Sequence, residues 1–274
     1  MMRARRTRMI ALLATAFAAA MGGCTDVVVN PTTVTALEFD SLPYPAVITG
    51  DTLRDSLGAA APLHAVAFNS AGAVIPNASI TYLALDSGVT IDPSGIVTAQ
   101  LRNGPVRLIA SAPGLQTGPI ALIVARRPDT VIVAPLANDT LFYTPLDNAA
   151  TNVTPALSLQ VATRDSLGGV PGTQGWLVSY QLFFHGQAVA ATDTTVAVVW
   201  NSGDRPSRID TTASDGTSSR IVRVHSTGLP TAIESLTVVA NVKYRGAPVP
   251  GSPVTYLIQL RPQPAPTGSA RSRR

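Results

Sequence analysis

The segment Gly88–Ala99, GVTIDPSGIVTA, decides the fold class. Its centre, Asp92-Pro93-Ser94-Gly95, is a turn signal, because Asp and Pro favour the start of a tight turn and Gly permits the positive φ that can end one. The residues on both sides are mostly β-branched, which favours extended structure. The segment therefore predicts a β-hairpin in which Ile91 and Val97 face inward across the two strands.

Short alternating runs continue in both directions from this hairpin. Apolar side chains alternate over Leu63–Phe68, Val106–Ser111, Ile221–His225 and Leu236–Val242, and a period of two is typical of a half-buried strand. Turn signals rich in Gly and Pro separate the runs, and no later segment holds a helical period for long. We therefore expect an all-β protein built from β-sandwiches.

The chain also contains a weak internal repeat. The stretch HAVAFNSAGAVIPNASITYLALD, which starts at His64, is echoed by LQVATRDSLGGVPGTQGWLVSYQL, which starts at Leu159. Each gives a strand, a polar Gly turn, a Pro and a second strand, so the sequence predicts two copies of one architecture. The break between them is Arg126-Arg127-Pro128-Asp129, which Pro128 makes short and fairly stiff.

The first copy resembles the bacterial immunoglobulin-like group 2 (BIG2) family over residues 35–125. The resemblance rests on the hairpin, on Val97-Thr98-Ala99 after it, on the later Gly104 and on the alternating strand from Val106 to Ala110. Tyr82 stands where the family often has Trp, and we expect it to fill the centre of the core. The resemblance implies an immunoglobulin-like sandwich in a cell-surface or adhesion context.

The first residues have the layout of a secretory signal peptide. A basic stretch, Met1–Met9, precedes the apolar run Ile10–Ala20. Met21-Gly22-Gly23-Cys24 then resembles the bacterial lipobox, with Met where Leu is usual, and Cys24 is the one cysteine of the chain. We therefore expect lipidation of Cys24, and acyl chains that hold the protein to a membrane. The alternative is an ordinary cleavable signal with an incidental cysteine.

These features predict six segments. The second copy resembles bacterial immunoglobulin-like domains more loosely, and a tail rich in Pro and Arg follows it. The segments are a lipoprotein signal peptide (1–23), a short linker (24–33), a BIG2-like domain (34–125), a second linker (126–129), a second immunoglobulin-like sandwich (130–261) and a disordered tail (262–274).

Composition limits the classes of function. Of the 274 residues 46% are hydrophobic and only 13% are charged, which excludes a disordered chain. The net charge of +4 comes from the ends, because residues 1–10 and 271–274 hold seven of the 20 basic residues. The rest of the chain has 13 basic and 16 acidic residues, so we expect no basic surface for nucleic acid.

No motif of catalytic or cofactor chemistry occurs in the sequence. There is no Walker loop, dinucleotide fingerprint, HExxH or Gly-x-Ser-x-Gly, and the two glutamates, Glu38 and Glu234, stand far apart. We therefore expect a protein that is not an enzyme, with no catalytic residue, no cofactor and no bound metal.

Two groups of residues remain as candidates for binding. Trp176 and Trp200 are candidates for ligand contact, since aromatic faces stack on sugars, although a core position also accounts for Trp176. Asp204, Asp210 and Asp215 could supply oxygen ligands to calcium, but they are more simply residues of turns and strand edges.

Together these observations predict an exported, lipid-anchored, non-enzymatic protein of the cell envelope. Thr25 follows the cysteine where a retention signal of the inner membrane would have Asp, which by resemblance implies the outer membrane. The sandwiches would serve as spacer or protein-interaction and adhesion domains, with a protein or glycan partner that the sequence does not name. The alternatives are a glycan- or polysaccharide-binding envelope protein and an enzyme whose site has no recognisable motif.

Overall fold

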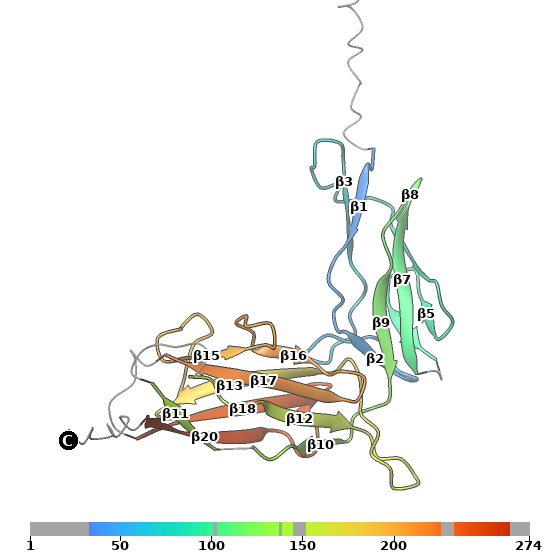
Figure 1. Cartoon of the computed structure of the whole chain (residues 1–274). Coiled ribbons are helices and arrows are strands. Elements are labelled where there is room, and N and C mark those ends of the chain that lie inside the picture. Colours follow the sequence, from blue (N-terminus) through green and yellow to red (C-terminus); the bar gives the residue numbers. More distant parts are fainter. Residues whose placement is uncertain (1–32, 101–102, 137–138, 145–151, 226–232, 264–274) are drawn as a thin grey trace, which may run out of the picture.

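The computed structural model describes residues 33–100, 103–136, 139–144, 152–225 and 233–263. All regular structure in these residues is β-strand (Figure 1), and they contain no apolar helix of membrane-spanning length. The expected signal peptide, Cys24 and the tail from residue 264 onward lie outside the described residues. The chain is all-β, as its alternating runs predict.

Strand pairing divides the described chain into an N-terminal module (residues 33–125) and a C-terminal module (residues 130–263), both immunoglobulin-like β-sandwiches. The strands of the N-terminal module are β1 (Ala36–Phe39), β2 (Ala46–Ile48), β3 (Ala65–Phe68), β4 (Thr81–Ala84), β5 (Val89–Ile91), β6 (Val97–Ala99), β7 (Gly104–Ala112), β8 (Leu115–Gln116) and β9 (Ile120–Ala125). One sheet has the order β2-β9-β7-β4, with β8 paired to β7, and β1–β3 and β5–β6 are two-stranded sheets.

The predicted hairpin is the β5–β6 pair. Ile91 lies opposite Val97 in its register, and Val97 is fully buried. Gly95 has a φ of 85°, so the positive φ expected of the turn is confirmed. Leu108 of β7 and Leu122 of β9 are likewise fully buried, because in both strands every second side chain faces the core.

The expectation for Tyr82 is wrong. Its side chain is only half-buried, and its ring lies 5.8 Å from that of Phe39 at the margin of the core. The physical reason is its strand: β4 pairs with β7 on one side and is the edge of its sheet, so even an inward-facing side chain remains partly accessible.

The C-terminal module has two larger sheets packed face to face (Figure 1). Its strands are β10 (Thr130–Val133), β11 (Thr140–Tyr143), β12 (Leu157–Ala162), β13 (Leu177–Phe184), β14 (Gln187–Ala188), β15 (Ala197–Trp200), β16 (Ile209–Thr211), β17 (Thr217–Val224), β18 (Glu234–Tyr244), β19 (Ala247–Pro248) and β20 (Val254–Pro262). One sheet has the order β10-β12-β17-β15 and the other β11-β20-β18-β13-β14, to which β16 and β19 add.

Alternating side chains of both sheets form the core of this module. Leu157, Val222, Val238 and Leu260 come from four different strands and are all fully buried. β20 extends to Pro262, so the sandwich includes the first residue that the sequence assigned to the tail.

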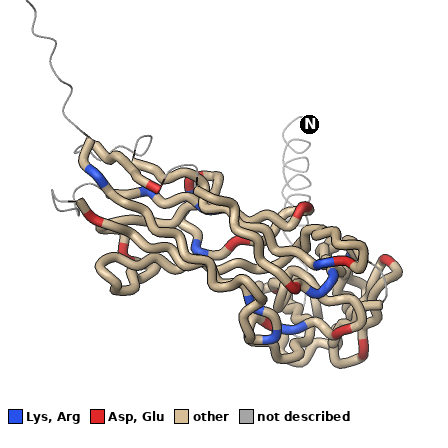
Figure 2. Tube along the Cα trace, turned by 90° about the horizontal axis from the view of Figure 1, so that it is seen from below, with Lys and Arg blue, Asp and Glu red and all other residues tan. Residues whose placement is uncertain are grey.

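The two modules point in different directions, which gives the molecule the shape of an L (Figure 1). Charged residues of both signs are scattered along its trace (Figure 2). No long stretch of the trace has a single sign.

Candidate functional site

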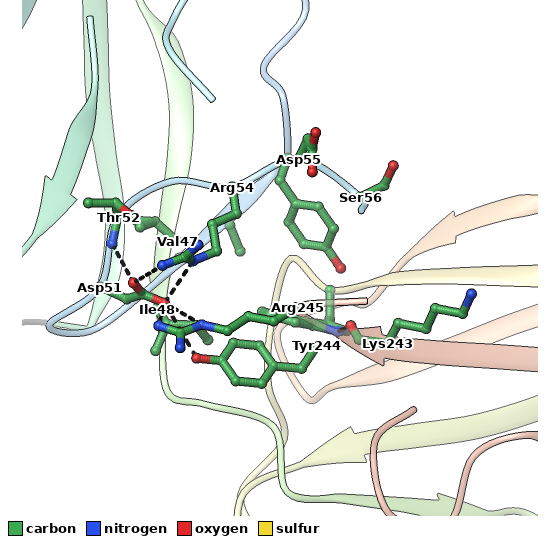
Figure 3. A pocket seen from close by; sticks show the side chains of 13 residues that line it. Val47, Ile48, Asp51, Thr52, Arg54, Asp55, Ser56, Lys243, Tyr244 and Arg245 are labelled. Atoms are coloured by element: carbon green, nitrogen blue, oxygen red, sulfur yellow. Dashed lines mark hydrogen bonds and ion pairs between the residues drawn. The ribbon is translucent and has the colours of Figure 1, made fainter. Parts of the chain in front are cut away.

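The candidate functional site is the junction where the two modules meet. The N-terminal module contributes β2 and the loop 49–58 that follows it. The C-terminal module contributes Trp176, just before β13, and the turn Arg245-Gly246 between β18 and β19 (Figure 3). These segments lie far apart in the sequence, and the fold brings them side by side.

A carboxylate clamped by two arginines lies at the centre of the junction. The Asp51 side chain is only 13% exposed, and its Oδ2 accepts hydrogen bonds from Arg245 Nη2 at 2.7 Å and from Arg54 Nε at 3.2 Å (Figure 3). Its Oδ1 accepts from Arg54 Nη2 at 3.1 Å and from the Thr52 amide at 2.8 Å. Arg54 belongs to the same module as Asp51, whereas Arg245 reaches it from the other module.

The clamp keeps this carboxylate ionised. Burial favours the neutral acid, but the hydrogen bonds from Arg54 and Arg245 outweigh it and hold the pKa of Asp51 well below its usual range. The hydrogen bonds to Asp51 in turn raise the pKa of Arg245. The pair is therefore fully charged at neutral pH.

Three aromatic rings pack beside the clamp. The Trp176 ring lies 5.1 Å from that of Tyr44 and 6.1 Å from that of Tyr244, both in tilted arrangements of the kind that aromatic pairs prefer. Trp176 Nε1 donates to the Lys243 carbonyl at 3.0 Å. The Tyr44 hydroxyl accepts from the Leu177 amide across the junction at 2.9 Å, and burial raises the pKa of Tyr44 above its usual range.

Glycines allow the backbones to approach closely at this contact. A Cβ on Gly175 would lie 3.1 Å from the Cβ atoms of Ala46 and Ile123 in the other module. A Cβ on Gly58 would lie 2.5 Å from the Cα of Arg245, closer than real Cβ atoms come to any backbone atom. The surfaces of the two modules therefore fit together without room for an added methyl group at either point.

The linker is also held in place. The Thr163 hydroxyl donates to the Arg127 carbonyl at 2.7 Å, and the Asp129 carboxylate accepts from the Arg164 amide at 2.9 Å. The Arg127 guanidinium lies 4.9 Å from the centre of the Tyr244 ring, within the range of a cation–π contact. The linker is thus fixed against the C-terminal module.

The space enclosed beside the clamp is too small for a ligand. It measures about 30 Å³, enough for about one or two water molecules, whereas ligand pockets typically measure roughly 300 to 1,000 Å³. At the clamp the geometry is therefore that of a fixed contact between two bodies.

The structure separates the two tryptophans that the sequence marked for ligand contact. Trp176 is 4% exposed, with its ring packed in the junction, so it presents no open face for stacking. Trp200, at the end of β15, is partly exposed, and the Arg223 guanidinium lies 5.1 Å from the centre of its ring. Cys24, the expected lipidation site, lies outside the described residues.

Two of the three aspartates weighed for calcium make other contacts, and the third, Asp204, lies in a turn with a φ of 55°. Asp210 pairs with Arg220 at 2.8 Å and accepts from the Ser218 hydroxyl at 2.8 Å, and Asp215 accepts from the amide and hydroxyl of Thr217 in a tight turn. Among the described residues, no group of three or more His, Cys, Asp or Glu is placed to share a metal ion.

Apart from Trp176, which the sequence marked for another role, the residues of the junction were not predicted from the sequence. Tyr44, Asp51 and Tyr244 match no motif, because their partners lie in the other module. One signal was present in the sequence: Arg245 precedes Gly246 in a predicted turn, a position where a tight hairpin favours Asn, Asp or Gly. A long cation at such a position indicates a partner for the side chain.

No family model matches the chain, and no curated protein matches its sequence. Solved structures do match the chain, at low sequence identity. Domains 4 and 5 of the S-layer protein SbsC are 12% identical, with 84% of this chain and 98% of that chain covered and a TM-score of 0.29. The adhesin InvE of Yersinia pseudotuberculosis is 15% identical, with 82% and 58% covered and a TM-score of 0.32.

A glycosyl hydrolase family 2 member from Bacteroides cellulosilyticus also matches, at 14% identity, with 74% of this chain and 23% of that chain covered and a TM-score of 0.27. At these scores the matches carry no statement about what this protein does.

Proposed function

We propose that the protein is a non-enzymatic, exported lipoprotein of the cell envelope, anchored in the outer membrane. In this proposal its two immunoglobulin-like modules form one stiff, bent spacer that holds a protein-interaction or adhesion surface away from the membrane. The observation that carries the proposal is the junction, where a clamped carboxylate, packed aromatic rings and close glycine contacts fix one module against the other. Modules that swing freely on a linker need none of these.

The path of the chain supports a spacer. The described chain begins beside β1, at the end of the N-terminal module away from the junction, and it ends after β20, at the far end of the C-terminal module (Figure 1). Cys24 stands only a few residues before the first described residue in the sequence. A lipid there would hold one tip of the L at the membrane and leave the other tip free.

The anchor is tested by replacing the cysteine. Cys24→Ala should move the protein from the membrane pellet into the soluble fraction, because no thiol remains to be acylated. Thr25→Ala is the matched control and should leave the protein in the pellet. A Cys24→Ala protein that stays in the pellet after a high-salt wash would overturn the lipid anchor.

The stiffness is tested with two glycines of similar φ. Gly175 and Gly186 have φ values of 77° and 74°, but an added Cβ meets the other module only at Gly175 and has open space at Gly186. Spin labels on Ser70→Cys and Leu257→Cys, in a Cys24→Ala background and diluted with unlabelled chain, should give one narrow distance distribution. Gly175→Ala should broaden or shift it, and Gly186→Ala should not. A broad distribution in the parent would show that the modules swing freely.

The alternative function, glycan binding, has less support in the structure. It rests on exposed aromatic residues at one end of a module, and burial of Trp176 leaves only Trp200 of the two tryptophans with an accessible ring. A change in glycan binding on Trp200→Ala would favour this alternative.

A further inference from the structure

The free edge of β4 carries main-chain groups that the fold leaves open. The Leu85 amide donates to the Arg107 carbonyl of β7 at 2.9 Å. Because alternate residues of an antiparallel strand face the same neighbour, Thr81 and Leu83 also face β7, and Tyr82 and Ala84 turn their N–H and C=O groups to the other side. No strand of the described chain pairs with that side.

Several other edges of the described sheets are covered or carry charge. The Val131 amide of β10 donates to the Pro250 carbonyl, and the Val199 carbonyl of β15 accepts from the Ser207 amide. The Ala67 carbonyl of β3 accepts from the Ile75 amide, and β1 contains the exposed Glu38. These are the usual ways in which proteins prevent strand addition, and the edge of β4 has none of them.

The side chains along β4 suit strand pairing as well. The segment Ile80–Leu85, ITYLAL, has no charge and no proline. Leu83 and Leu85 point outward and are 47% and 46% exposed. A groove of about 340 Å³ runs beside Tyr82, lined mainly by apolar residues of β3 and of the segment 74–80. An added strand would gain main-chain hydrogen bonds, and the groove could receive its inward-facing side chains.

We propose that β4 pairs with β4 of a second copy of this chain, antiparallel and about a two-fold axis through Leu83. In this register Tyr82 of each copy exchanges main-chain hydrogen bonds with Ala84 of the other. Leu83 lies opposite Leu83 of the second copy and Leu85 lies opposite Thr81 of the second copy. This interaction surface goes beyond the spacer and does not depend on the lipid anchor.

A second copy fits this edge because the edge is self-complementary. An uncharged strand does not repel its own copy, whereas like charges placed directly opposite destabilise a pair. The two-fold axis brings the two exposed Leu83 side chains together and removes both from water. An isologous contact of this kind closes at two copies and does not propagate.

Disulfide trapping tests the register. At a non-hydrogen-bonded antiparallel pair the Cα atoms lie about 4.5 Å apart, within the range of about 4.4 to 6.8 Å that a disulfide spans. In a Cys24→Ala background, Leu83→Cys should therefore form a covalent dimer under mild oxidation. Leu85→Cys is the matched control: its two copies would lie about 14 Å apart, at about 3.4 Å per residue, and should not cross-link.

Sedimentation tests the dimer without a cross-link. The mature Cys24→Ala chain should show a concentration-dependent dimer, and Leu83→Lys should be a monomer because it places like charges opposite each other. Ala84→Pro, which removes the free-edge amide, should also be a monomer, and circular dichroism should show that both variants keep the parent fold. A parent that stays monomeric, or a Leu85→Cys variant that cross-links as well as Leu83→Cys, would overturn the proposal. So would a parent that stays monomeric and instead binds a foreign extended peptide at this edge.

Discussion

Gly95 shows how one residue decides the geometry of the hairpin. Its φ of 85° lies in the region that side chains with a Cβ rarely adopt. A Cβ there would also lie 3.2 Å from Cε2 of Tyr82 and 3.3 Å from the Leu63 carbonyl oxygen. Two physical effects, backbone strain and a close contact, therefore favour glycine at this position.

The two effects predict an order of stability. Gly95→Asn should cost about 1 kcal/mol, because Asn tolerates positive φ, and Gly95→Val should cost more, because branching at Cβ makes that region least accessible. About 1 kcal/mol lowers the melting temperature of a domain of this size by roughly 4–8 °C. Thermal unfolding of the mature chain should rank wild type above Asn and Asn above Val. Gly72 is the control, because it has a φ of 75° and open space around it. Gly72→Val should lower the melting temperature through backbone strain alone, and therefore by less than Gly95→Val.

Two hairpin turns of the C-terminal module place a non-glycine residue at a positive φ. The β13–β14 turn, His185-Gly186, and the β18–β19 turn, Arg245-Gly246, each have two residues of positive φ, as a type I′ turn requires. His185 lies 2.5 Å from Glu234 of its own module, whereas Arg245 contacts Asp51 of the other module. Neither residue is the Asn that such a turn favours, and each has a side-chain partner instead.

Replacing Arg245 or His185 by Asn distinguishes the role of the side chain in its turn from its role in the junction. Arg245→Asn should suit the turn but remove the contact with Asp51, so the label distances between the modules should broaden while the C-terminal module melts no lower than before. His185→Asn is the matched control and should leave the distances unchanged. If Arg245→Asn gives the parent distribution, the ion pair does not hold the junction.

The strands could be predicted from the sequence more completely than the contacts between strands and between modules. The period of two placed Val97 and Leu108 correctly, because it reports which side of its own sheet a residue faces. It does not report which strands are edges, and the expectation for Tyr82 failed for that reason. The junction was out of reach because Asp51 and Arg245 stand 194 positions apart and no local pattern records such a pairing.

One ionised carboxylate contributes to the shape of the whole molecule. The hydrogen bonds that hold the pKa of Asp51 below its usual range include one from Arg245, which exists only while the modules are docked. A carboxylate with a depressed pKa contributes its full stabilisation above the ordinary value of about 3.9, and this stabilisation is lost as the pH falls through the depressed value. The pKa of Asp92 is also depressed, by a hydrogen bond from the Ser94 hydroxyl within its own turn, so that group does not affect the junction.

Acid should therefore loosen the L shape through Asp51. Small-angle scattering of the mature chain should give one profile from pH 7 down to about pH 4, the ordinary range of the carboxyl group. Below that pH it should change towards a more flexible pair while the far-UV spectrum still reports folded strands. Asp51→Asn removes the charge at every pH, so its profile should already be the flexible one at pH 7 and should change little on acidification. Asp92→Asn, the control, should follow the wild type. An Asp51→Asn protein that matches the wild-type profile at pH 7, or that changes at the same pH as the wild type, would show that aromatic packing and the glycine contacts hold the modules without this ion pair.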